Sequence, residues 1–352
     1  MCSPAGNRRF FALASSLFAP ILAGGCARPS GPLFTQLAKP PVWPAPPETA
    51  RIRYVGMLTG SEDLNAAQSG GEVLAAALRG PRQPLAFSAP HTPARSGSLL
   101  AVADPGNAGV HLLDLVARTH LLVTGWQEAG VDERLSVPIG VCLVGTRMYV
   151  TDAQRHEVVV FDVHGAFQRR FGADALLRPV GIVHTTAPDR LFVVDGGAHC
   201  VVVFDLDGNE VRRFGHSGSA LGEFRYPTHI AWDGGERIAV ADSANFRVQL
   251  FKRDGTSLSS IGKKGDAAGD FALPKGVAFD RTGRLYVVDA QFENVQVFDR
   301  KGRLLIAFGQ EGGDPGEFAL PAGLAIDPEN RIWVADSANH RIQVFDYVGN
   351  VP

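Results

Sequence analysis

One pattern recurs six times between residue 99 and the end of this chain, and it constrains the fold more than any other feature of the sequence. Each copy contains a short apolar run that ends in an aspartate. Valine or isoleucine follows six residues after the aspartate, and phenylalanine, or leucine in the first copy, follows nine residues after it. The spacings of 48, 43, 47, 47 and 47 residues indicate one repeated supersecondary unit. The anchor aspartates are Asp104, Asp152, Asp195, Asp242, Asp289 and Asp336.

Each copy supplies four short runs with the composition of β-strands, which are clearest at residues 276–279, 285–288, 295–298 and 304–308. Aspartate and glycine lie between them where tight turns need these residues. This order predicts a four-stranded antiparallel meander. One such sheet cannot bury both of its faces alone, so its repetition every 40 to 50 residues or so predicts an all-β fold, a six-bladed β-propeller.

The last copy reaches the end of the chain at Pro352 before it can form a fourth strand. Residues 51–58 have strand composition and no other partner, so we predict that this N-terminal strand completes the last blade and closes the ring. Residues 72–79 have helix-forming composition and predict a short helix on the rim.

The last copy contains the segments Leu320-Pro-Ala-Gly323, Trp333-Val-Ala-Asp336, Asn339-His-Arg-Ile342 and Gln343-Val-Phe345. In these segments the repeats resemble the NHL repeat family, and the resemblance covers about residues 84–349. It implies the propeller fold. It does not choose a function, because propellers host both binding and catalysis, and calcium lactonases and streptogramin lyases are similar to this chain in blade architecture.

The N-terminus predicts export. Arg8 and Arg9 precede an uncharged apolar stretch, and Leu22-Ala-Gly-Gly-Cys26 resembles the lipobox of bacterial lipoproteins, with Ala23 where that pattern has a large aliphatic residue. We expect a signal peptide at 1–25, a lipid-anchor cysteine, Cys26, with a proline-rich tether at 26–50, and one propeller at 51–352. The product is then an exported membrane lipoprotein facing the periplasm or the cell surface. A soluble periplasmic protein cut nearby is the alternative, and the export route is either general secretion or the twin-arginine route.

Charge and cysteine content narrow the partners. The net charge is −2, so the chain lacks the basic excess that binds a phosphate backbone, and we expect no nucleic-acid partner. Cys142 lies in a predicted inner strand and Cys200 begins a third strand in the next repeat, so their Cα atoms should be too far apart for a disulfide. We expect both to be buried free thiols. We also expect a monomer and no cofactor.

The candidate site lies at one end of the propeller. In a meander, the loop that leads into the inner strand and the turn between the second and third strands share one face, which we name the mouth. The mixed charged and aromatic residues there favour binding of a protein or peptide partner in the cell envelope. The predicted partner-binding residues are Arg155, His156, His199, Tyr226, His229, Phe246, Arg247, Lys275, Phe292, His340 and Arg341.

The sequence favours a non-catalytic scaffold or sensor, and a metal-dependent lyase or lactonase at the mouth is the alternative. His156, His199 and His340 could hold zinc, but they occupy equivalent positions on separate blades, so we expect no metal site. His229 replaces a glycine found in other copies and, with the turn histidines, would serve the catalytic alternative. We expect the anchor aspartates to be turn acceptors. In the predicted inner strands, 85–87, 141–143, 182–184, 230–232, 277–279 and 324–326, only His184 could bind a metal.

Overall fold

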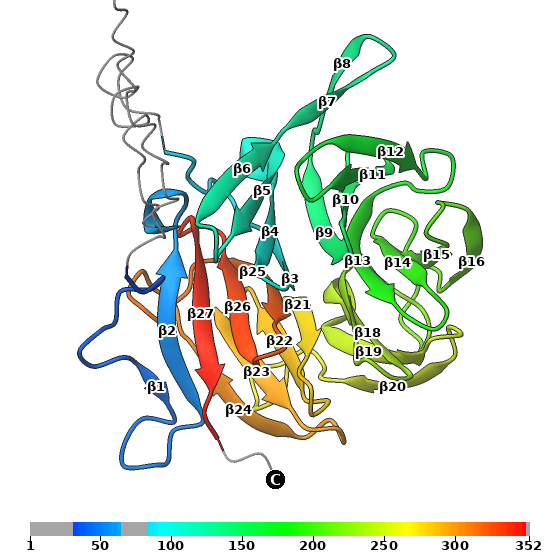
Figure 1. The fold of residues 1–352 in the computed structure, drawn as a ribbon. Helices are drawn as coiled ribbons and strands as arrows, with labels where there is room; N and C mark the ends of the chain where they lie inside the picture. Colours follow the sequence, from blue (N-terminus) through cyan, green and yellow to red (C-terminus); the bar gives the residue numbers. More distant parts are fainter. Residues whose placement is uncertain (1–30, 65–83, 350–352) are drawn as a thin grey trace, which may run out of the picture.

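Six antiparallel sheets follow one another around a ring in a computed structural model that describes residues 31–64 and 84–349 (Figure 1). The prediction of a six-bladed propeller with four-stranded blades is confirmed. Blade one contains β3 (Thr92–Ser96), β4 (Leu99–Asp104), β5 (Gly109–Asp114) and β6 (Thr119–Val123). Blade two contains β9 (Pro138–Val144), β10 (Arg147–Asp152), β11 (Glu157–Asp162) and β12 (Phe167–Phe171). Blade three contains β13 (Pro179–Thr185), β14 (Arg190–Asp195), β15 (Cys200–Phe204) and β16 (Glu210–Phe214).

The second half of the ring repeats this order, and the innermost strands of all six blades contact one another in sequence around the axis. Blade four contains β17 (Pro227–Trp232), β18 (Arg237–Asp242), β19 (Arg247–Lys252) and β20 (Ser257–Ile261). Blade five contains β21 (Pro274–Phe279), β22 (Leu285–Asp289), β23 (Asn294–Phe298) and β24 (Leu304–Phe308). Blade six contains β25 (Pro321–Ile326), β26 (Arg331–Asp336) and β27 (Arg341–Tyr347).

The N-terminal strand closes the ring as predicted. In blade six, β2 (Ile52–Leu58) pairs antiparallel with β27, and β1 (Val42–Trp43) adds a short fifth strand outside it. Residues 31–50, assigned from the sequence to the tether, lie in part against this blade. The Trp43 ring lies 5.9 Å from that of Phe345 in β27, and the buried Phe34 ring lies 6.1 Å from that of Trp333 in β26. The helix predicted at 72–79 lies outside the described residues.

The core lies between the blades, because each sheet buries one face against each neighbour. Val287 and Phe298 of blade five pack with Ala239 and Val248 of blade four in one such cluster, and all four are almost fully buried. The middle strands are therefore apolar on both faces, which explains their continuous valine, isoleucine and phenylalanine runs. Cys142 and Cys200 are buried free thiols, as predicted, and burial raises their pKa values to about 12 and about 11.

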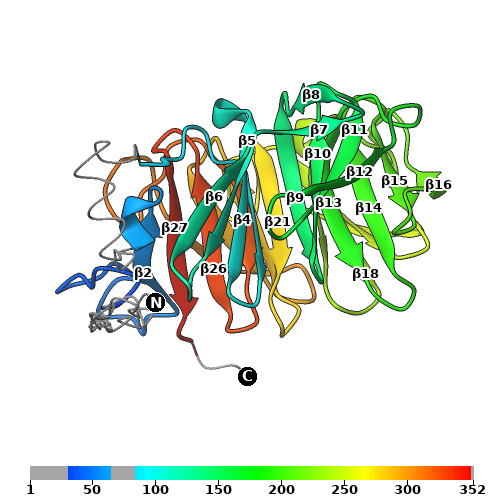
Figure 2. The ribbon, with the colours of Figure 1, turned by 45° about the horizontal axis from the view of Figure 1, so that its top comes forward.

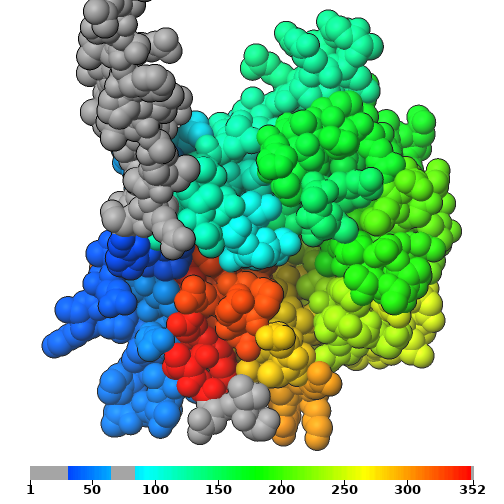
Figure 3. Space-filling view, viewed as in Figure 1, coloured from blue at the N-terminus to red at the C-terminus, as the bar shows by residue number. Residues whose placement is uncertain are grey.

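Two features differ from the sequence prediction. The inner strand of blade one is β3, whereas residues 85–87, predicted for that role, make only the isolated bridge of Ala86 to Gly60. An unpredicted hairpin, β7 (Gly125–Glu128) and β8 (Val131–Arg134), lies between blades one and two and projects from the ring (Figures 1 and 2). It also protrudes in the space-filling view (Figure 3).

Helical structure in the described part of the chain is limited to three single turns. They are η1 (Glu62–Leu64), η2 (Pro105–Asn107) and η3 (Ser243–Asn245). Within residues 31–64 and 84–349, no helix has the length and apolar character needed to span a bilayer.

Candidate functional site

The turn between the second and third strands has the same backbone conformation in every blade. The fourth residue after each anchor aspartate has a positive φ, between 45° and 61°. These residues are Ala108, His156, His199, Phe246, Glu293 and His340. The side chain at this position points toward the loop that leads into the inner strand of the next blade, which we name the lead-in loop.

The three turn histidines bind this neighbouring backbone. The His156 Nδ1 atom hydrogen-bonds the Leu177 carbonyl, and the His340 Nδ1 atom hydrogen-bonds the Ser88 carbonyl. The Tyr226 amide donates to His199 Nδ1 at 3.0 Å. Each imidazole therefore connects two adjacent blades, and the three belong to three separate contacts around the ring.

Arg247 and Arg341, both predicted to contact a partner, are held inside the protein instead. The Arg341 Nε atom donates to the anchor Asp336 at 2.7 Å, and its Nη atoms donate to the carbonyls of Gly313, Asp314 and Glu317 in the lead-in loop of its own blade. Arg247 repeats this arrangement on the anchor Asp242 at 2.8 Å. The Arg341 side chain is 6% exposed and the Arg247 side chain is 13% exposed. They fix the loops, so we correct their assignment to partner binding.

Three other predicted residues are partly occupied by neighbours. Arg155 Nε pairs with Glu157 at 2.6 Å, and its guanidinium lies 5.1 Å from the Trp126 ring of the projecting hairpin. The Lys264 ammonium lies over the half-buried Phe246 ring, 5.2 Å from its centroid. Phe292 is half-buried, and its amide donates to the anchor aspartate at 3.1 Å.

The anchor aspartates are turn acceptors, as predicted, and they also hold the lead-in loop. In blades four and six the turn donor is an asparagine side chain, Asn245 or Asn339, and in the other four blades the donors include backbone amides. Asp152 accepts the amides of Gln154 and Arg155 in its own turn. It also accepts the amides of Ser136 at 2.6 Å and Val137 at 3.1 Å from the lead-in loop. One carboxylate thus joins the two segments that form the mouth in each blade.

Six side chains of the lead-in loops and of the start of the inner strand β21 remain accessible at the mouth. Leu177, Tyr226 and Leu320 are 63%, 58% and 53% exposed. Arg178, Arg225 and Lys275 form no ion pair and no side-chain hydrogen bond with any residue that the structure describes. These three cations belong to the adjacent blades three, four and five. The mouth also has a carboxylate, Glu293, in the turn of blade five that faces blade six.

At the ring axis, glycine lets the inner strands approach closely. A Cβ atom added at Gly181 or Gly276 would lie 2.6 Å from a carbonyl oxygen of the next inner strand. His229 stands at the equivalent position in blade four and reaches across the axis. Its Nε2 atom lies 3.0 Å from where a Cβ of Gly323 in blade six would be.

The His229 ring meets side chains from blades one and five. It stacks on His91, with ring centroids 5.1 Å apart and an interplanar angle of 10°. The Thr92 hydroxyl lies 3.2 Å from both His91 Nδ1 and His229 Nε2. Lys275 lies on the neighbouring inner strand, β21, and its charge acts on both imidazoles. We name His91, Thr92, His229 and Lys275 the channel cluster.

Burial sets the charge of the channel cluster. The pKa of His91 falls to about 4, mainly because its ring is buried and also because of the Lys275 ammonium. Burial holds the pKa of His229 well below its ordinary value, and the positive potentials of His91 and Lys275 add to this. Burial also lowers the pKa of Lys275. Both imidazoles are therefore neutral at pH 7.

Of the channel cluster, His229 and Lys275 were predicted from the sequence, and His91 and Thr92 were not. The missed residues lie in Pro90-His91-Thr92, which aligns with Pro274-Lys275-Gly276 and the other Pro-x-Gly starts. Because the inner strand of blade one was placed at residues 85–87, this alignment was overlooked. The signal in the sequence was Thr92, which stands where most other starts have glycine.

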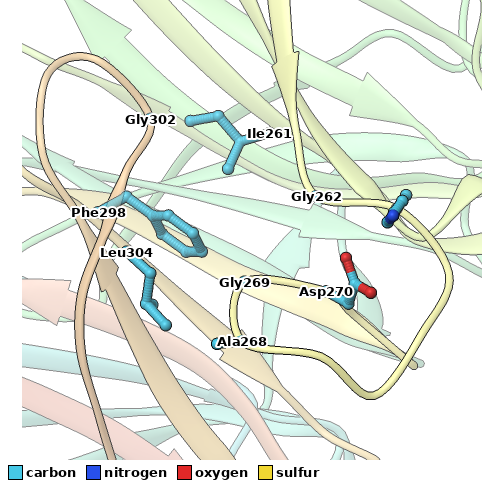
Figure 4. A pocket seen from close by; sticks show the side chains of 9 residues that line it. Ile261, Gly262, Ala268, Gly269, Asp270, Phe298, Gly302 and Leu304 are labelled. Atoms are coloured by element: carbon cyan, nitrogen blue, oxygen red, sulfur yellow. The ribbon is translucent and has the colours of Figure 1, made fainter.

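The structure has a shallow hollow of about 300 Å³ between blades four and five, bordered by the lead-in loop of blade five (Figure 4). Phe298, Leu304 and Ile261 line one side, and the loop from Gly262 to Asp270 borders the other.

The residues described here contain no group of three or more His, Cys, Asp or Glu side chains placed to hold one metal ion. His184, the one ligand foreseen on an inner strand, pairs with Asp189 at 2.9 Å. The donor set that the metal-dependent alternative needs is therefore not assembled by this part of the chain.

Comparison with known families and proteins gives one match in sequence. Residues 318–345 match the NHL repeat family. This segment runs from the end of a lead-in loop to the third strand of blade six, so the predicted NHL repeat is confirmed for this blade. None of the curated proteins matches the sequence.

Solved structures share the fold at low sequence identity. An auxiliary nutrient binding protein from Bacteroides thetaiotaomicron has a TM-score of 0.58 at 13% identity, over 75% of this chain and 70% of its own. A gluconolactonase from Xanthomonas campestris has a TM-score of 0.56 at 16% identity, over 74% of this chain and 86% of its own. A streptogramin B lyase has a TM-score of 0.52 at 11% identity, over 74% of this chain and 94% of its own. These similarities show the fold alone.

Proposed function

Starting from a six-bladed β-propeller that carries an NHL repeat, we propose that this protein binds an acidic peptide segment of a partner protein across its mouth. One observation carries the proposal. Most polar side chains of the mouth are engaged within the protein, whereas Leu177, Leu320 and Tyr226, whose ring contacts His199 edge-on, are more than half exposed. The cations Arg178, Arg225 and Lys275 have no ion pair or side-chain hydrogen bond with any described residue. Exposed Tyr226 is the type of residue that anchors a protein interface.

The positions of these groups fit an extended, negatively charged ligand. Leu177 and Arg178 are adjacent in blade three, and Arg225 and Tyr226 are adjacent in blade four. A peptide crossing these two blades toward Lys275 would find an apolar contact beside a cation at each step. The fold similarity to a nutrient binding protein is consistent with a binding role.

Site-specific crosslinking tests the proposed surface. A photoreactive benzoylphenylalanine at position 226 is expected to capture a fluorescein-labelled octapeptide of alternating Asp and Leu, and not its matched Lys and Leu peptide. The same group at Val211, an exposed residue of the outer strand β16, is the control. We expect the double variant Arg178→Ala, Arg225→Ala to lose at least tenfold in crosslinked product. Equal capture at positions 226 and 211 would overturn the proposal.

We also propose that the propeller acts outside the cytoplasm as a lipid-anchored protein of the cell envelope. The support is the N-terminal sequence: the arginine pair, the apolar stretch and Cys26, which all lie outside the described residues. Metabolic labelling with a tritiated fatty acid, followed by membrane fractionation, tests it. Labelling and membrane association should both disappear in Cys26→Ser, whereas a soluble exported wild-type protein would contradict the anchor.

A further inference from the structure

The channel cluster is the place where the repeat departs most from its own pattern. In the Pro-x-Gly starts, blades two, three and six have Ile139, Val180 and Ala322 at the middle position, each followed by glycine. Blade one has His91 and Thr92, blade four has His229 and blade five has Lys275. The departures come from three blades, and the fold brings them together at the mouth end of the axis.

One hydroxyl couples the two imidazoles. Thr92 Oγ1 is within hydrogen-bond distance of a ring nitrogen of both His91 and His229, but a hydroxyl has one proton. It donates to one ring and accepts from the other, so the tautomers of the two neutral rings depend on each other. A change of protonation on His229 is therefore transmitted to His91.

Two groups of the channel cluster lack partners. His229 is 5% exposed, and its Nδ1 atom has no partner that meets the geometry of a hydrogen bond in the described part of the protein. The Lys275 backbone is a polar neighbour on that side, close enough to oppose the fall in the His229 pKa. The Lys275 ammonium, half-buried, forms no ion pair or hydrogen bond there either. Burying polar groups without partners is unfavourable, and a single anion with acceptor oxygens would satisfy both.

We propose that the channel cluster binds one carboxylate group, and that a proton is taken up by the imidazole pair when it binds. The inference rests on the proposed function for its ligand, since an acidic peptide supplies the carboxylate. A carboxylate is favoured over a phosphate dianion because the cluster holds one fixed positive charge, and proton uptake would add a second only after the anion is present. The site would thus receive one acidic residue of the partner.

The surrounding charges allow this protonation to depend on the ligand. The titratable and charged groups on elements packed against His229 are His91 and Arg95 on or beside β3, His184 on β13, Arg190 and Asp195 on β14, Arg237 and Asp242 on β18, and Lys275 on β21. Asp195 and Asp242 are bound to loop amides or to Arg247, and Arg237 pairs with Asp233. No described carboxylate therefore compensates a proton on His229, and a bound carboxylate would raise its pKa.

Acetate binding, followed by calorimetry between pH 7.0 and 5.5, tests the site without the peptide. The affinity should increase as the pH falls, by up to tenfold per pH unit, because the complex binds a proton that the free protein does not. Two pairs of variants isolate the residues. Lys275→Met should weaken acetate binding at least tenfold, and His229→Gln should remove the pH dependence. Lys301→Met and His164→Gln, both exposed and on turns at the far end of blades, should change neither.

The outcomes separate this inference from the proposed function. Acetate binding with proton uptake, competed by the acidic octapeptide, supports both. Acetate binding with proton uptake but no peptide binding supports the carboxylate site and overturns the peptide function. Peptide binding that acetate does not compete, at constant affinity across this pH range, overturns the carboxylate site. Tighter binding of inorganic phosphate than of acetate would also overturn it, as would acetate affinity unchanged in Lys275→Met.

Discussion

The lead-in loops of blades five and six begin alike and are held differently. Both have the same length, from Gly262 to Phe271 and from Gly309 to Phe318. In both, the first glycine has a positive φ and lies against the buried phenylalanine that ends the segment, and the anchor aspartate accepts loop amides. The shared part of the repeat therefore sets where each loop starts and ends.

The difference lies in the side chains beneath the loop. In blade six, Arg341 donates to three loop carbonyls and Asn339 donates to Gly312 at 2.8 Å. Blade five has Asn294 and Phe292 at these positions, and neither side chain donates to its loop. The Gln296 side chain on β23 donates to the Asp270 carbonyl at 2.9 Å. The oxygens Asn294 Oδ1 and Gln296 Oε1 are left without partners. The hollow of Figure 4 borders this loop.

This comparison teaches how to interpret a polar residue in a repeat protein. Arg247 and Arg341 recur at one position of two blades, together with asparagine two residues before and glutamine two residues after. A set that recurs together serves the repeat itself. The residues that break the pattern, such as His229 and Lys275, are the better candidates for function.

The largest effect is expected from removing Arg341, which holds the lead-in loop of blade six. Arg341→Ala should lower the free energy of unfolding by about 3 to 5 kcal/mol, because the fully buried Asp336 would lose its cationic partner. Urea denaturation measures this. Arg303→Ala, which removes an exposed partner of Asp299, should cost less than about 1 kcal/mol. Similar losses for both variants would contradict the assignment of Arg341 to the fold.

The architecture could be predicted from the sequence. The spacing of the repeats gives the number of blades, and the absence of a fourth strand from the last copy shows where the ring closes. The pairing of residues 52–58 with β27 followed from the early end of the last copy. The hairpin β7 to β8 was not predicted, because the first spacing, 48 residues, hardly differs from the 47 of most other copies, so the anchor pattern carries no sign of the hairpin.

The site was predicted only in part, because its contacts join blades far apart in the sequence. His229 was identified by a single departure from glycine, but its partner His91 is 138 residues away and lies in the most degenerate copy. The roles of Arg247 and Arg341 depend on loop carbonyls, which have no signature in a sequence. Exposure alone could distinguish Tyr226, which is accessible, from Arg341, which is not.

A second variant asks whether the arginine acts in blade four as in blade six. Arg247→Ala should lower the free energy of unfolding by about 3 kcal/mol, slightly less than Arg341→Ala, because the Arg247 side chain is more exposed. Arg247→Lys should recover little of this loss, since one ammonium cannot reproduce the forked contacts to Asp242, Ala220 and Glu223. Full recovery by lysine in urea denaturation would show that charge alone suffices.

The shared glycine tests what the two loops have in common. Gly262→Ala and Gly309→Ala should each lower the free energy of unfolding by about 1 to 3 kcal/mol, because φ is near +80° and +90° and a Cβ would collide with Phe271 or Phe318. Gly313→Ala, where an added Cβ meets nothing within 4 Å, is the control. Thermal unfolding should place the first two variants together and the control near wild type. Markedly unequal losses would mean that the loop starts are not equivalent.

The smallest effect comes from building the missing contacts into blade five. The double variant Phe292→Asn, Asn294→Arg gives this blade the turn residues of blade six, beneath a loop of the same length. We expect a gain of about 0.5 to 1 kcal/mol, because loop carbonyls at residues 265–270 would acquire donors while the loop loses conformational freedom. Hydrogen exchange is the sharper measurement, since amides of residues 263–270 should exchange more slowly and those of 310–317 should not change. Unchanged exchange in the first segment would mean that the arginine needs more of the blade-six surroundings than these two residues supply.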